Sequence, residues 1–71
     1  MFLPMMTPVA SSNIAAVGYE NGDLYIAFNN GTVYRYFGVP QTVYTALMSA
    51  PSHGRFLNTY VRDLYPYQRL R

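Results

Sequence analysis

The chain has 71 residues, a formal net charge of +2, no cysteine and no tryptophan, and all of its basic side chains except one histidine are arginines. This length leaves room for one small domain, and the missing cysteines exclude disulfides and thiolate metal sites. A hydrophobic content of 51% with 11% charged residues argues against intrinsic disorder, and 8 tyrosines are typical of a folded binding module.

No apolar run approaches the roughly 18 residues that a membrane span requires. The apolar opening, residues 1–6, lacks a basic start and is too short to be a signal peptide. We therefore expect a cytoplasmic protein that has no membrane partner and is a monomer when free.

Residues 1–12, which contain two prolines and a serine pair, are predicted to form a flexible N-terminal arm on a single domain spanning residues 13–71. Two Asn-Gly dipeptides, Asn21-Gly22 and Asn30-Gly31, favour tight hairpin turns. They separate three predicted strands near residues 13–19, 24–28 and 33–37, which form an antiparallel meander.

Two-residue loops at both dipeptides would place Tyr19 opposite Leu24, Val17 opposite Ile26, and Phe28 opposite Val33. One face would then be mainly aliphatic and the other would combine small residues with tyrosines. The first face is Ala15, Val17, Tyr19, Leu24, Ile26, Phe28, Val33, Arg35 and Phe37, and the second is Ile14, Ala16, Gly18, Tyr25, Ala27, Tyr34 and Tyr36. Two alternatives stay open: the helices cover the aliphatic face, or they cover the small residues and leave Arg35 in solvent.

After Phe37 the apolar period becomes helical. One helix is predicted over about residues 40–50, with Pro40 in its first turn. A second begins at a Ser52 cap and continues its apolar stripe to Leu64. The fold class is therefore α+β, in the order β-β-β-α-α, with both helices on one face of a three-stranded sheet.

Catalytic chemistry has little support in the sequence. His53 is the only imidazole, and the only acids are Glu20, Asp23 and Asp63. These residues match no nucleophile–base set and no metal-site spacing, and no glycine-rich phosphate loop is present. We expect a protein that is not an enzyme and has no catalytic residues, cofactor or metal.

With catalysis unsupported, the remaining possibility is that the protein binds a partner through its surface. The tyrosines of the second sheet face could stack on bases or pack into a protein groove, or simply be strand formers. The C-terminal arginines could engage phosphate or an acidic protein surface, or form an ordinary solvated face. The predicted partner-binding residues are Tyr34, Arg35, Tyr36, Arg55, Arg62, Tyr65, Tyr67 and Arg69.

An ordered set of short motifs resembles the KTSC domain, which is named after the C-terminus of certain lysyl-tRNA synthetases. The set includes Val17-Gly18-Tyr19, Asn30-Gly31-Thr32-Val33, Val39-Pro40 and Gly54-Arg55-Phe56-Leu57-Asn58, with Tyr34-Arg35-Tyr36 as the family's YxY signature. The resemblance covers about residues 9–69 and implies a small domain with RNA as a possible partner.

The length and the opening Met1-Phe2-Leu3-Pro4 also resemble small phage regulators of transcription. That resemblance implies a protein that binds bacterial RNA polymerase, inhibits initiation and promotes antitermination. RNA polymerase is thus the first expected partner, and an RNA-binding KTSC module is the alternative.

Overall fold

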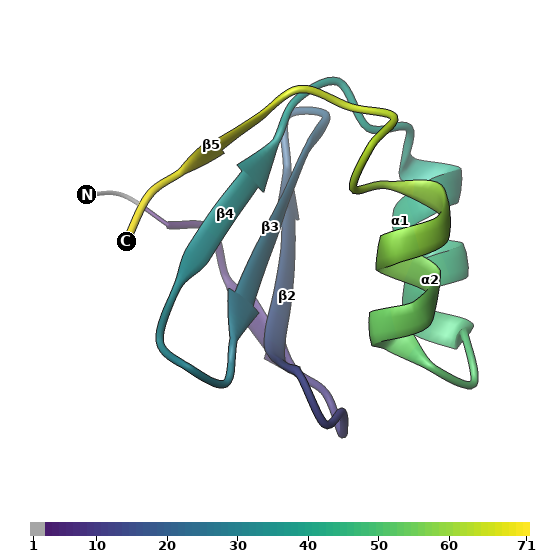
Figure 1. Ribbon diagram of the computed structural model, residues 1–71. Coiled ribbons are helices and arrows are strands. Elements are labelled where there is room, and N and C mark those ends of the chain that lie inside the picture. The colour runs from purple at the N-terminus through teal and green to yellow at the C-terminus, as the bar shows by residue number, and fades with distance from the viewer. Residues whose placement is uncertain (1–2) are drawn as a thin grey trace.

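The computed structural model describes residues 3–71, which form one antiparallel sheet with two helices on one of its faces (Figure 1). The elements in chain order are β1 (Met6–Pro8), β2 (Ile14–Glu20), β3 (Asp23–Phe28), β4 (Val33–Tyr36), α1 (Gln41–Ser49), α2 (His53–Tyr60) and β5 (Tyr67–Arg69). The strands lie in the order β1-β2-β3-β4-β5. The α+β class and the central meander are confirmed, but the prediction of a three-stranded sheet was wrong, because a short strand is added at each edge.

The first hairpin forms as predicted. Asn21 and Gly22 both adopt positive φ, 54° and 81°, as a type I′ turn requires. The register places Val17 opposite Ile26 and Tyr19 opposite Leu24. The Asn-Gly pair therefore fixes the pairing of β2 with β3.

The second hairpin differs from the prediction by one residue, since Val33 pairs with Ala27 and not with Phe28. Of the dipeptide Asn30-Gly31, only the glycine has positive φ, 92°. The amide of Phe28 donates to the carbonyl of Thr32 at 2.8 Å, which closes a three-residue loop. The Asn30 side chain stabilises this loop by accepting from the amide and the hydroxyl of Thr32.

This shift exchanges the two faces of β4. Tyr34 and Tyr36 pair with Ile26 and Leu24, so they lie on the aliphatic face that the helices cover. Arg35 lies on the opposite face beside Tyr25. The predicted grouping of Val33, Arg35 and Phe37 with the aliphatic face was therefore wrong. The helices cover the aliphatic residues of β2 and β3, as the first alternative stated, and Arg35 lies on the opposite face, as the second alternative stated.

A bulge in β2 changes one more side chain. The register shifts between Ile14 and Ala16, so Ile14 turns toward the helices and is fully buried. It therefore lies on the same face as Val17 and Ile26, whereas the alternation pattern placed it on the opposite face. The core cluster consists of Ile14, Val17, Leu24, Ile26, Tyr36, Val39, Leu47, Leu57 and Val61.

The second helix begins as predicted and ends earlier. The Ser52 hydroxyl accepts from the amide of Arg55 at 3.3 Å, which confirms the cap. Helix α2 ends at Tyr60, and Val61 leaves helical geometry with φ −126°. The apolar stripe therefore does not continue to Leu64, which is 66% exposed.

The predicted N-terminal arm, of which the structure describes residues 3–12, contributes strand β1 to the sheet. Residues Met6–Pro8 pair with β2, and Pro4 is buried. Gly18 allows this close approach, because an added Cβ would lie 2.6 Å from the Sδ of Met6. Residues 1–2 of the arm lie outside the described residues. Within residues 3–71, neither helix has the length and apolar character needed to cross a membrane.

Candidate functional site

Three of the eight predicted partner-binding residues, Tyr34, Tyr36 and Arg62, line one cleft between the sheet and α2. The cleft has a volume of about 270 Å³ and is also lined by Phe28, Asn30, Thr32, Leu57 and Asn58. It continues into a wider hollow of about 440 Å³, lined by Ser12, Asn13, Phe28, Asn29, Asn30, Asn58 and Arg62. We call the two together the β4–α2 cleft.

Aromatic rings form one wall of the β4–α2 cleft. Phe28 and Tyr34 meet edge to face with their ring centroids 5.7 Å apart. Tyr67 stacks on Tyr34 from β5, with centroids 5.4 Å apart and an interplanar angle of 16°. The pairing of β4 with β5 produces this stack, because it sets the two tyrosines on the same face of neighbouring strands.

Tyr36 lies at the base of the cleft and is 3% exposed. Burial raises the pKa of its phenol above the ordinary value of 10.0, and the nearby guanidinium of Arg62 acts in the opposite direction. Tyr36 is therefore an O–H donor at neutral pH. Asn58 and Arg62 stand one helical turn apart along the chain and reach the same cleft.

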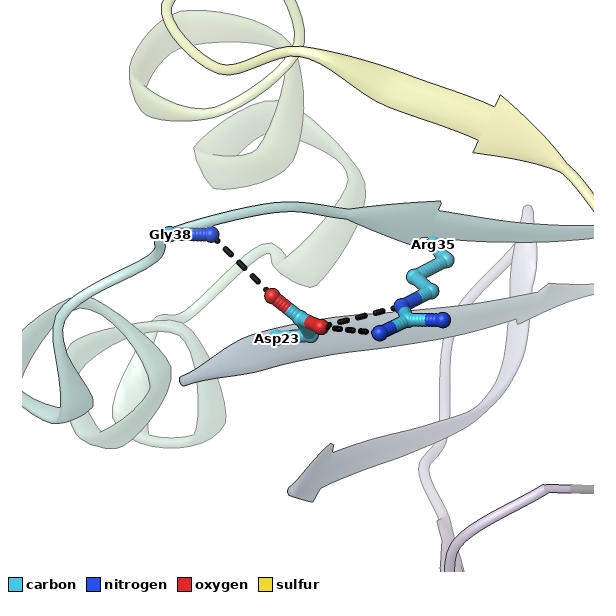
Figure 2. Close-up of polar contacts among 3 residues, drawn as sticks. All are labelled: Asp23, Arg35 and Gly38. Atoms are coloured by element: carbon cyan, nitrogen blue, oxygen red, sulfur yellow. Dashed lines mark hydrogen bonds and ion pairs between the residues drawn. The ribbon is translucent and has the colours of Figure 1, made fainter. Parts of the chain in front are cut away.

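Arg35 lies on the face of the sheet opposite the helices, apart from the cleft. Its Nε and Nη2 donate to Oδ2 of Asp23 at 3.0 and 2.5 Å, and the other carboxylate oxygen accepts from the amide of Gly38 at 3.1 Å (Figure 2). The carboxylate raises the pKa of the Arg35 guanidinium. The same guanidinium lies 5.6 Å from the ring centroid of Tyr25 and 4.8 Å from that of Phe37. The Asp23 carboxylate at the start of β3 therefore links that strand to Arg35 in β4 and to the backbone at Gly38, after β4 ends.

The other predicted residues are spread over the remaining surface. Arg55 lines a second, shallower groove with Pro51, Phe56 and Tyr60, in which the two rings lie 4.7 Å apart. Tyr65 packs against the core, whereas Tyr67 and Arg69 are exposed on the edge strand β5. Of the eight residues, the structure thus places Tyr34, Tyr36 and Arg62 in the cleft. Tyr67 and Arg69 lie on the neighbouring strand β5, opposite Tyr36 and Tyr34.

Sequence reasoning missed the amide side chains of the β4–α2 cleft. Asn13, Asn29 and Asn30 precede or form turns, and their type there is explained by turn geometry. Asn58 carried a usable signal, because its four-residue spacing from Arg62 would place both on one side of the predicted second helix, although α2 itself ends at Tyr60. The amide side chains share a cleft with β4 only in the observed register of β3 and β4, and the sequence pattern predicted that register with an error of one residue.

The geometry defines a small α+β domain with a polar and aromatic surface cleft. The KTSC domain model matches residues 10–65, and the chain belongs to the KTSC domain family. The crystal structure of a KTSC domain protein from Yersinia pestis is similar, with a TM-score of 0.88 and 34% identity, covering 94% of this chain and 97% of that chain.

Two curated relatives differ in size. A protein of Tsukamurella paurometabola is 42% identical over 62 residues, which cover 84% of this chain and 92% of the relative. A lysine–tRNA ligase of Nostoc sp. is 35% identical over 69 residues, which cover 94% of this chain and 12% of the ligase. The same domain thus forms nearly all of one relative and a small part of the other.

Proposed function

We propose that this protein is a small regulator that docks on bacterial RNA polymerase, inhibits transcription initiation and promotes antitermination. The resemblance of its opening residues to phage regulators supports the choice of partner. The proposal of docking rests on the exposed surface around β5. Tyr67 is 57% exposed there, and Arg69 and Arg71 are exposed beside it.

Tyrosine and arginine are the side chains that dominate strong protein contacts. Strand β5 is also an edge strand, so one side of its backbone is open to an extended segment of a partner. The residues that line the β4–α2 cleft include no carboxylate, histidine or thiol, which favours binding over acid–base catalysis.

The test is direct binding of the purified protein to purified bacterial RNA polymerase holoenzyme, with and without nuclease. We expect a nuclease-resistant complex, less promoter-dependent transcript and more readthrough of a terminator. The double variant Tyr67→Ala/Arg69→Ala should weaken the complex, whereas Arg55→Ala, in the separate groove beside Pro51, serves as the matched surface control. Failure of the holoenzyme to form any complex with the folded protein would contradict the proposal.

RNA binding is the second candidate function. The lysine–tRNA ligase relatives and the aromatic, amide and guanidinium groups of the cleft favour it. Its signature is affinity for single-stranded RNA that falls as salt rises and as Arg55, Arg62 and Arg69 are neutralised. The absence of a mobility shift with labelled RNA at low salt would remove this candidate.

A further inference from the structure

The Tyr36 hydroxyl opens into the β4–α2 cleft and makes no hydrogen bond with any residue in the described part of the chain. The residue as a whole is only 3% exposed, but its hydroxyl is accessible, because no fully buried side-chain oxygen or nitrogen among the described residues lacks a partner. The hydroxyl of Tyr19, in contrast, donates to the carbonyl of Val39. An accessible hydroxyl at the base of a cleft, with no partner inside the protein, is available to donate to a ligand.

Two further hydrogen-bond donors line the β4–α2 cleft, and neither side chain is paired with another group among residues 3–71. The guanidinium of Arg62 forms no ion pair, not even with the adjacent Asp63, and the amide of Asn58 makes no side-chain hydrogen bond. The residues that line the cleft include no carboxylate. A phenol, an amide and a guanidinium together match the oxygens of a phosphate group.

The remaining wall is suited to a planar ring. Phe28 and Tyr34 present aromatic surface to the same cleft that holds the donors. The hollow beside them carries the amides of Asn13, Asn29 and Asn30, although the Asn29 amide nitrogen already donates to the carbonyls of Ser11 and Ser12. Amide groups pair with the polar edges of bases.

We propose that the β4–α2 cleft binds one nucleotide, with its phosphate on Tyr36, Asn58 and Arg62 and its base against Phe28 and Tyr34. The nucleotide is either a free mononucleotide or a residue of single-stranded RNA, since both offer the same chemistry. The site adjoins the exposed β5 surface assigned to polymerase docking, since Tyr67 stacks on Tyr34, but neither Tyr67 nor Arg69 lines the cleft. Only its RNA source rests on the RNA-binding function proposed above.

The test is a titration of the isotopically labelled protein with uridine monophosphate, adenosine monophosphate and octauridylate, followed by amide NMR shifts. We expect shifts of the Asn58 side-chain amide and of the backbone at Tyr34 and Tyr36. Tyr36→Phe removes only the unpaired hydroxyl, so it should leave thermal stability at neutral pH unchanged or raised while weakening binding about tenfold. Arg62→Gln should weaken binding similarly, and Tyr60→Phe, which removes a hydroxyl from an exposed tyrosine of the other groove, is the matched control that should not.

Each outcome decides between the possibilities. Mononucleotide binding that Tyr36→Phe weakens assigns a free nucleotide, and octauridylate binding alone with the same dependence assigns RNA. RNA binding that is insensitive to both cleft variants overturns the cleft site but keeps the RNA function. The absence of shifts with all three ligands overturns the cleft site and the RNA function while leaving polymerase docking intact.

Discussion

The close contact between β1 and Gly18 predicts an unusual response to the change Gly18→Ala. An added Cβ would lie 2.6 Å from the Sδ of Met6 and 3.1 Å from the carbonyl oxygen of Met5. The methionine side chain can turn away, but the carbonyl belongs to the backbone that enters β1. Overpacking of this kind costs about 1–3 kcal/mol. Alanine in a strand normally gains about 0.5–1 kcal/mol over glycine.

The balance is a loss of up to about 2.5 kcal/mol in the free energy of unfolding. The cost is limited because β1 pairs only with β2 and can separate from it. Urea denaturation measures the loss, and hydrogen exchange locates it. The amide of Val9 donates to the carbonyl of Ala15 at 3.1 Å, so it should lose protection in the variant.

Gly54→Ala is the matched control, with the opposite sign expected. Gly54 lies in α2, and its added Cβ would meet only the side chain of Asn13, at 3.5 Å and 3.9 Å, which is ordinary contact. Alanine in a helix should stabilise the protein by about 0.5–1 kcal/mol. Stabilisation by Gly18→Ala with Val9 still protected would refute the argument from crowding.

The remaining predictions concern the core, the helix cap and alkaline pH. Leu47 is fully buried between the helices and the sheet, so Leu47→Ala should lower the free energy of unfolding by about 2–5 kcal/mol in urea denaturation. Ser52→Ala removes the side-chain cap of α2 and should cost about 1 kcal/mol in the same assay. Burial raises the pKa of Tyr36 above its ordinary value of 10.0, so the folded state holds this proton more tightly than the unfolded state. That contribution to stability is complete below pH 10.0 and is lost as pH rises through the folded-state pKa, and Tyr36→Phe should remove this part of the alkaline decline in denaturation midpoint.

The two Asn-Gly turns show how far local sequence determines this fold. At Asn21-Gly22 both residues adopt positive φ, and the predicted register follows. At Asn30-Gly31 the asparagine side chain instead bonds to Thr32, and a longer loop becomes the better solution. This competition between side chain and backbone is invisible in a dipeptide pattern, and it decides whether Tyr36 or Arg35 faces the helices.

The edge strands were missed for a different reason. Each of β1 and β5 has three residues, too few for alternation to be recognised, and each is positioned by its neighbour in the sheet. The candidate site depends on the same long-range pairings. Tyr34, Tyr36 and Arg62 were singled out by residue type, but their shared cleft requires the register of β4 and the packing of α2.

The Asp23–Arg35 pair also gives the molecule a front and a back. A sheet covered by helices on one side alone would leave its reverse side to a partner or to aggregation. Here an arginine lies over two rings on that side and is anchored by a carboxylate, and Pro4 is buried where the N-terminal segment approaches Gly18. The chain's own side chains and N-terminal segment thereby cover much of the reverse side, so the cleft and the outer strands are the surfaces that stay open.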